Sequence, residues 1–261
     1  DLMEQATLAA ADDTGKGTRV LARVQSVQVV NVLAGTDADP AGELARRLGI
    51  PDGDRLTTTI GGNTPQWLVN RACDQIVSGD LDAILVVGAE ALASRRRARA
   101  RDESRAAPQL AGRVIGDARN GVGPAESAAG VVAPAQLYPW FESALAYRAG
   151  RTPDAQRDFL GRLMAPFTHV AAKNAYAWFP EIATPEELST VGPSNRLVGE
   201  PYTKRMNAMI QVDQGAALLV MSAAAARAAR VPPERWVFPW AGADLHEVFF
   251  PVERPHLFAA P

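Results

Sequence analysis

The chain has 261 residues, of which 47% are hydrophobic and 21% are charged, and its formal net charge is −2. This is the composition of a globular protein with one large domain or two small ones. The slightly negative charge argues against a dedicated nucleic-acid binder, and no apolar run approaches the roughly 18 residues that span a membrane. A single cysteine, Cys73, excludes a disulfide framework within the chain, and we expect a cytoplasmic protein.

The first part of the chain, residues 1–90, alternates between predicted helices and predicted strands. Helical periodicity, with a glycine at the end, marks three segments: 2–15, 39–49 and 63–79. Runs of β-branched and apolar residues mark three strands: 24–33, 55–59 and 82–90. This alternation predicts an α/β fold in which helices are layered around a mixed, mostly parallel sheet.

The alternation breaks after residue 90. Residues 91–205 are rich in helices, prolines and loops, and they form a predicted helical insertion domain. One helix is well marked near 136–150, and another begins at Thr152. Residues 206–261 are expected to return to the α/β part.

Two helices carry apolar faces that we expect to be buried. In the helix of residues 63–79, this face consists of Leu68, Val69, Ala72, Cys73, Ile76 and Val77. In the helix that begins at Thr152, it consists of Phe159, Leu160, Leu163, Met164, Phe167 and Val170. A buried strand is predicted at Asp213–Ser222, and a last short strand is predicted at Arg235–Trp240.

Three stretches in order along the chain resemble the N-terminal half of a thiolase: Gly61–Leu92, the helical insertion, and the strand and helix after it. In thiolases the catalytic cysteine lies at the start of a buried helix, which ends in an Ile-x-x-Gly turn before a strand ending in Gly-Gly/Ala-x-Glu. These features match Ile76, Gly79 and residues 88–90, and the family's Asn-Asp-Gly-Ala-Ala strand matches residues 213–217. The chain is similar to actinobacterial thiolase-like proteins, often labelled acetyl-CoA acetyltransferases, that lack the nucleophile.

The resemblance implies an acyltransferase of lipid metabolism with a coenzyme A thioester as its ligand, but the chain departs from the family at the active site. Alignment on the end of the helix puts Gly62 where thiolases have their acyl-accepting cysteine, and Thr64 where they have a serine. Residues 208–210 replace an Asn-Ala-Ser loop whose serine helps to hold pantetheine. We therefore expect no covalently bound cofactor and no acyl-enzyme. The expected substrate-binding residues are Gly61, Gly62, Asn63, Thr64, Met209 and Ile210.

The resemblance also implies family features that lie outside these residues. The family's first strand, central in its sheet, would precede Asp1, and its second half would follow Pro261. A sheet without its central strand is expected to leave neighbouring strands with unpaired buried backbone groups. Thiolases dimerise through the strand before the glycine turn, so we expect a homodimer through Leu56–Ile60 at a sheet edge. Some relatives pair with a small OB-fold domain, which is a second expected partner.

The residues near the glycine turn have structural alternatives to a functional role. Cys73 fits an inert core position, and Thr64 fits a helix cap better than a nucleophile that has no base. The backbone amides of Gly61 and Gly62 can bind a thioester or enolate oxygen at the helix N-terminus. Alternatively, these glycines only form a tight turn.

The strongest charge run is Ser94–Arg105. Arg95, Arg96 and Arg97 are candidates for binding the phosphates of coenzyme A, and the alternative is a solvated loop. None of the three histidines has a spacing that indicates a metal site.

The sequence thus predicts a thiolase-like protein that binds or acts on acyl-CoA without ordinary thiolase activity. Two other functions stay open. One is a thiolase-fold retro-aldolase acting on an acyl-CoA, a reaction that needs no acyl-cysteine. The other is a non-catalytic scaffold or binding subunit.

Overall fold

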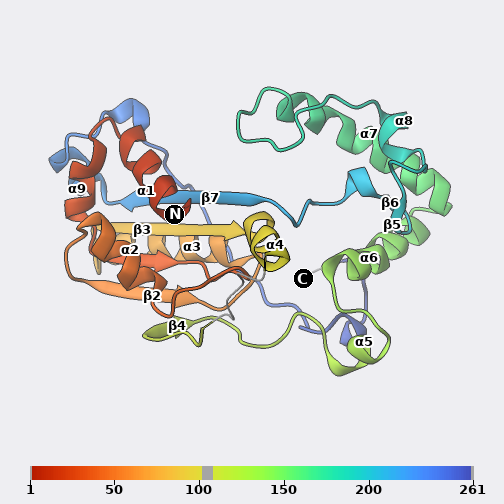
Figure 1. Ribbon diagram of the computed structural model, residues 1–261, viewed down its shortest axis with the longest axis horizontal. Helices are drawn as coiled ribbons and strands as arrows, with labels where there is room; N and C mark the ends of the chain where they lie inside the picture. Colours follow the sequence, from red (N-terminus) through yellow and green to blue (C-terminus); the bar gives the residue numbers. More distant parts are fainter. Residues whose placement is uncertain (1, 102–107, 260–261) are drawn as a thin grey trace. The chain divides into compact units, whose positions relative to one another are not determined.

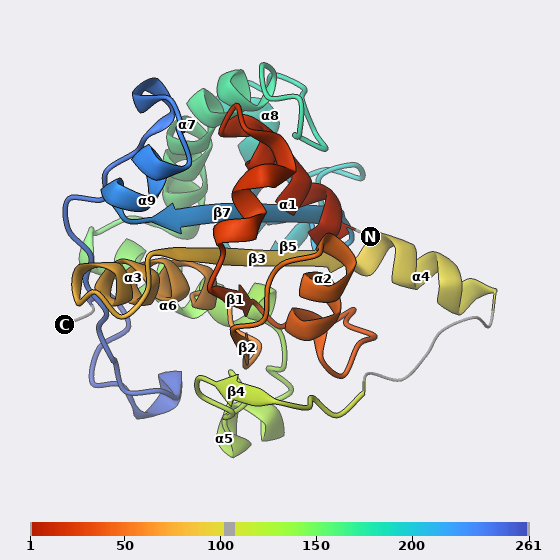
Figure 2. The ribbon, with the colours of Figure 1, turned by 90° about the vertical axis from the view of Figure 1, so that its left-hand side faces the viewer.

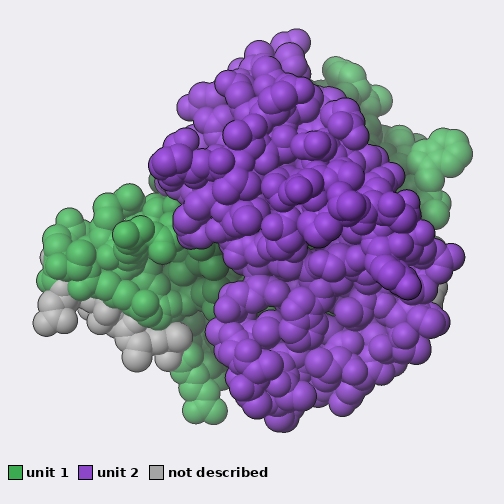
Figure 3. All heavy atoms as spheres, turned by 90° about the vertical axis from the view of Figure 1, so that its right-hand side faces the viewer, with its two compact units in different colours: residues 1–118, 210–244 green, residues 119–209, 245–261 purple. Residues whose placement is uncertain are grey.

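The structure, a computed structural model, describes residues 2–101 and 108–259. It divides the chain into two compact units, which Figure 3 distinguishes by colour. Unit 1 comprises Asp1–Ala118 and Ile210–Asp244, and unit 2 comprises Arg119–Met209 and Leu245–Pro261. Unit 2 therefore interrupts unit 1 in the sequence.

Unit 1 is built around a five-stranded sheet (Figures 1 and 2). The strands are β1 (Ser26–Val29), β2 (Asp54–Thr58), β3 (Ala83–Ala91), β4 (Arg113–Ile115) and β7 (Asp213–Met221). The helices are α1 (Leu2–Asp13), α2 (Pro40–Leu48), α3 (Thr64–Val77), α4 (Leu92–Ala100) and α9 (Ala223–Ala228), with 3-10 turns η1 (Gly17–Arg23) and η3 (Pro233–Arg235). In the order β4-β2-β1-β3-β7, all neighbours are parallel except β3 and β7. The predicted α/β fold with a mixed, mostly parallel sheet is confirmed.

Local sequence signals position α2 on one face of the sheet. The Asp39 side chain accepts a hydrogen bond from the Gly42 amide at 3.0 Å, and Pro40 occupies the first turn. Gly49 ends the helix in the left-handed conformation with φ of 63°. The apolar side of α2, including Leu44, packs with α1 against β1 and β3 in one core cluster.

The opposite face of the sheet is covered by α3, which buries a narrower stripe than its sequence predicts. Leu68 and Ala72 are fully buried, and Leu68 packs with Leu56 and Ile84 of the sheet. Val77, however, is 88% exposed, so the prediction that it is buried is wrong. The reason is the helical period, because nine residues at about 100° each place Val77 opposite Leu68.

The sheet has no gap at its centre. β1 pairs with β2 on one side and directly with β3 on the other, from Ser26 opposite Ile84 to Val29 opposite Val87. The unpaired backbone groups expected around a missing central strand are therefore not found, and that prediction is wrong.

The strand that precedes the glycine turn is not a sheet edge. β4 pairs in parallel with β2, and the Thr59 amide donates to the Ile115 carbonyl at 2.8 Å. The edge placement of Leu56–Ile60 is therefore wrong over the paired residues. A homodimer through this strand stays a prediction, and it requires β4 to move.

Unit 2 is mainly helical. Its helices are α5 (Pro124–Ala128), α6 (Pro134–Arg148), α7 (Pro153–Ala171) and α8 (Pro185–Ser189), with strands β5 (Leu197–Gly199) and β6 (Tyr202–Thr203) and 3-10 turns η2 (Lys204–Met206) and η4 (Pro251–Glu253). Thr152 caps α7, and Thr184 and Glu187 form the capping box that begins α8. The predicted apolar face of α7 is only partly buried, because its packing partners Leu188 and Met206 gather around Leu160. The exposed members of that face are Leu163 (51%), Phe167 (67%) and Val170 (67%).

The limits of the two units differ from the expected domain limits at 90 and 205. Unit 1 continues to Ala118 because β4 joins its sheet.

The segment predicted as a strand at Arg235–Trp240 does not form one, and Trp240 is 97% exposed. Pro239 lacks a backbone donor, which disfavours a paired strand at this position.

Candidate functional site

The turn Gly61–Thr64 connects β2 to the first residue of α3. The amides of Thr64 and Trp67 donate to the carbonyls of Gly61 and Asn63, at 3.2 and 3.1 Å. Within the described part of the chain, the amides of Gly62 and Asn63 have no hydrogen-bond acceptor. These two N–H groups therefore remain free for a ligand at the positive end of the helix dipole.

Gly62 lies in open space. A side-chain carbon built at this position would have no described heavy atom within 4 Å, and its φ lies outside the left-handed region. The glycine at the family's cysteine position is therefore not required by crowding or by backbone strain. There is room for a cysteine side chain or for an atom of a ligand.

Thr64 does not cap the helix with its side chain. Its hydroxyl donates to the Gly61 carbonyl, and the residue is 6% exposed. The Asn63 side chain makes no capping hydrogen bond either. The predicted side-chain cap is wrong, because Thr64 is itself the first helical residue and its hydroxyl points back along the turn. The acceptor is a peptide carbonyl, which is not a base that can take the hydroxyl proton, so this contact does not activate Thr64 as a nucleophile.

Cys73 lies three turns into α3 and is half-buried. Burial raises the pKa of the Cys73 thiol, and the nearby Asp74 carboxylate raises it further. Both effects disfavour the thiolate, which is the reactive form of cysteine. This side chain does not replace the missing nucleophile at Gly62.

The three candidate arginines lie on α4 and have different surroundings. The Arg95 guanidinium donates to the Leu33 carbonyl. Arg96 donates to the Gln211 side chain at 2.5 Å, and Arg97 pairs with the Asp213 carboxylate at 3.1 Å. All three arginines hold neighbouring segments of unit 1. Residues 102–107 of the predicted charge run lie outside the described residues.

Met209 and Ile210, the other predicted substrate-binding residues, lie in the loop before β7. Both are exposed, Met209 at 40% and Ile210 at 65%. Met209 is the last residue of the first segment of unit 2, and Ile210 begins the second segment of unit 1. Their assignment as substrate-binding residues stays a prediction.

A cavity of about 600 Å³ lies in unit 1, where the loop after β1 and the end of β3 meet α1, α2 and α4. Its lining includes Met3, Val32, Leu44, Ala89 and Arg95. The carboxyl edge of an α/β sheet is where such folds bind ligands, and the volume is that of a small-molecule site. Sequence analysis missed this cavity, since its wall is assembled from segments that lie far apart in the sequence, from Leu2 to Asp213.

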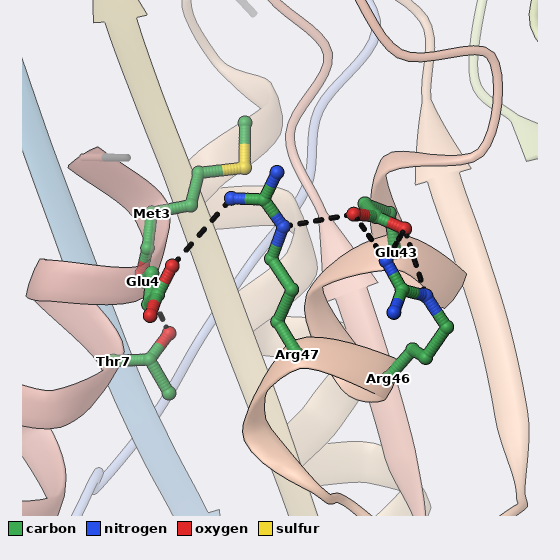
Figure 4. A network of polar contacts seen from close by, with 6 residues as sticks. All are labelled: Met3, Glu4, Thr7, Glu43, Arg46 and Arg47. Carbon is green, nitrogen blue, oxygen red and sulfur yellow. Dashed lines mark hydrogen bonds and ion pairs between the residues drawn. The ribbon is translucent and has the colours of Figure 1, made fainter.

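Charged side chains connect α1 to α2 at the rim of this cavity (Figure 4). The Glu43 carboxylate accepts hydrogen bonds from Arg46 at 2.7 Å and from Arg47 at 2.8 Å. Arg47 also reaches Glu4 of α1 at 3.6 Å. The hydrogen bonds from Arg46 and Arg47 hold the pKa of the Glu43 carboxyl below its ordinary value of 4.5, and the bond to Glu43 raises the pKa of Arg47.

This network predicts a pH-dependent contribution to stability. Because the pKa of Glu43 is lowered in the folded state, its contribution is present above pH 4.5 and is lost as the pH falls through the lowered folded-state value. We expect wild type to resist urea better than Glu43→Gln near neutral pH, with the difference vanishing under acid conditions. Urea midpoints across this range test the expectation, and a constant difference at all pH values contradicts it. Added salt should also reduce the difference in urea midpoint, since the ion pairs of Glu43 with Arg46 and Arg47 lie at the surface.

A buried polar cluster in unit 2 connects α6, α7 and β6. The Tyr202 hydroxyl donates to the Glu142 carboxylate, which also accepts a hydrogen bond from the Gln156 amide at 2.5 Å. Burial, followed by the hydrogen bond to Glu142, raises the pKa of Tyr202. These groups satisfy one another, so the cluster is explained by its role in holding three elements together.

Neither a metal site nor a membrane-spanning helix is found in the part of the chain that the structure describes. No group of three or more His, Cys, Asp and Glu side chains has the arrangement of a metal site. No helix among residues 2–101 and 108–259 is long and apolar enough to cross a membrane.

Comparison with solved structures gives the fold a close counterpart. A monomeric SCP2-thiolase-like protein type 1 (STLP1) from Mycobacterium smegmatis matches with a TM-score of 0.72 and 29% identity, covering 90% of this chain and 44% of that one. An Ltp2-ChsH2(DUF35) aldolase matches with a TM-score of 0.56 and 23% identity, covering 87% of this chain and 51% of that one. No protein-family model and no curated protein matches the sequence. The chain therefore has a thiolase-like fold and spans about half the length of these two proteins or less.

Proposed function

We propose that the protein binds an acyl-CoA thioester at the Gly61–Thr64 turn without forming an acyl-enzyme. The observation that carries the proposal is the open position of Gly62 just before α3, where the amides of Gly62 and Asn63 have no acceptor among the described residues. A thioester oxygen that gains negative charge would be stabilised by these amides and by the helix dipole. In thiolases, which this chain resembles, the position that matches Gly62 faces the acyl group.

A covalent route lacks its nucleophile. Gly62 has no side chain, the Thr64 hydroxyl is engaged with the Gly61 carbonyl, and the Cys73 thiol has a raised pKa. A thiolase needs a thiolate that attacks the thioester carbon. The activity that remains for this turn is the recognition and polarisation of a thioester or enolate oxygen.

A thiolase-fold retro-aldolase acting on an acyl-CoA is the second candidate. The match to an aldolase favours it, and retro-aldol cleavage proceeds through an enolate that needs polarisation but no acyl-cysteine. Its acid and base residues are not identified among the residues of the turn. An OB-fold partner and a homodimer remain expectations drawn from the resemblance to thiolases.

Calorimetry with acetyl-CoA and longer acyl-CoAs tests the proposal on the full-length protein. We expect Gly62→Val to weaken binding at least about tenfold, since a branched side chain would occupy the space of the thioester. Gly121→Val is the matched control, because Gly121 also lies in open space with φ outside the left-handed region. Equal affinity of wild type for free coenzyme A and acyl-CoA, or equal effects of the two variants, would count against a thioester site. Cleavage of a β-hydroxyacyl-CoA would favour the aldolase, and no binding at all would favour a scaffold.

A further inference from the structure

The cavity of about 600 Å³ in unit 1 is separate from the glycine turn. It lies on the face of the sheet that α1 and α2 cover, whereas α3 covers the opposite face. Much of its wall is hydrocarbon, with Leu2 and Met3 from α1, Val32 after β1, Leu44 from α2 and Ala89 from β3. A wall of this kind favours an aliphatic ligand.

Most of the charges on this wall are neutralised by neighbours. Arg47 pairs with Glu43 and Glu4 (Figure 4), and Asp213 pairs with Arg97 at 3.1 Å. Asp37 is exposed, so water screens its charge. Arg95 is the exception, because among the described residues no carboxylate lies within ion-pair distance of its guanidinium.

Arg95 is held in place but keeps hydrogen-bonding capacity. One of its Nη atoms donates to the Leu33 carbonyl, and a guanidinium has five N–H donors in total. The Glu90 carboxylate fixes the same loop by accepting the amides of Leu33 at 2.8 Å and Ala34 at 3.0 Å. The cation and the adjoining wall are therefore positioned before any ligand arrives.

We propose that this cavity binds an aliphatic molecule with one anionic head group. The aliphatic part of the ligand packs against the wall formed by α1, α2 and β3. Its head group pairs with the Arg95 guanidinium, whose fork matches a carboxylate or a phosphate. The site is independent of the thioester turn.

Octanoate, octyl phosphate and octanol serve as calorimetric probes of the full-length protein. We expect octanoate or octyl phosphate to bind at least about tenfold more tightly than neutral octanol, and the better of the two identifies the head group. Arg95→Met should abolish this preference while octanol still binds, and Arg95→Lys should restore part of it. Arg99→Met is the matched control on the same helix, since Arg99 is exposed and does not line the cavity.

Several results would overturn the proposal. The first is that neither octanoate nor octyl phosphate binds wild type at millimolar concentration. The second is that Arg95→Met weakens the binding of octanoate and of octanol equally. The third is that Arg99→Met changes octanoate binding as much as Arg95→Met does. Gly62→Val should leave octanoate binding unchanged. Failure of the thioester site and failure of this cavity are thereby distinguished.

Discussion

Replacement of Gly62 by cysteine is expected to create a thiol that acetyl-CoA acylates, whereas wild type, with Cys73 as its single cysteine, should give no adduct. The new side chain would enter open space at the start of α3. A helix N-terminus lowers the pKa of a cysteine from about 8.5 towards about 7, which increases the thiolate fraction at neutral pH about tenfold. We therefore expect acylation about tenfold faster than at an exposed cysteine elsewhere.

Gly121→Cys provides that comparison, since its side chain would also meet no described heavy atom within 4 Å. Intact-mass measurements over time give the acylation rates, and thiolate absorbance as a function of pH gives the two pKa values. Equal rates at the two positions would show that the turn neither activates a thiol nor holds the thioester. Faster acylation together with an unchanged pKa would assign the effect to substrate binding.

Shortening Leu68 to alanine is expected to lower the free energy of unfolding by about 2–5 kcal/mol. Leu68 is fully buried between α3 and the sheet, where it packs near Leu56 and Ile84, so the substitution leaves a cavity beneath the helix. The same helix offers an internal comparison in Val77, which is 88% exposed. Val77→Ala should change the free energy by no more than about 0.5 kcal/mol.

Urea unfolding of the full-length protein measures both changes. Because the Gly61–Thr64 turn begins α3, Leu68→Ala should also weaken thioester binding through poorer positioning of the turn. A loss at Val77 as large as that at Leu68 would mean that the outer face of α3 is covered in solution by something other than the described residues.

The elements that the sequence predicts well are those whose ends are encoded locally. Asp39, Pro40 and Gly49 mark the limits of α2 because capping and left-handed turns depend on single residues. The mostly parallel sheet is predicted because buried strands and amphipathic helices alternate along the chain, whereas its thiolase-like character is implied by the resemblance. In the candidate site, the position of the turn and of Gly62 follows from the same short-range pattern.

The features that the sequence does not predict depend on distant partners. β4 is only three residues long, and it becomes a strand because β2 offers it a parallel neighbour. The direct pairing of β1 with β3 likewise depends on which strands meet. Arg95 appears in the sequence as one of several arginines in a charge run. Its place on a cavity wall depends on the ends of β1 and β3 coming together.

The interruption of unit 1 by unit 2 has a consequence for synthesis on the ribosome. β3 pairs along its full length with β7, yet roughly 120 residues separate the two strands. At about 5–20 residues per second, β3 waits roughly ten seconds for that neighbour. During this interval a nine-residue apolar strand presents unpaired backbone groups to other nascent chains. Translation speed through residues 119–209 therefore becomes a determinant of the yield of folded protein.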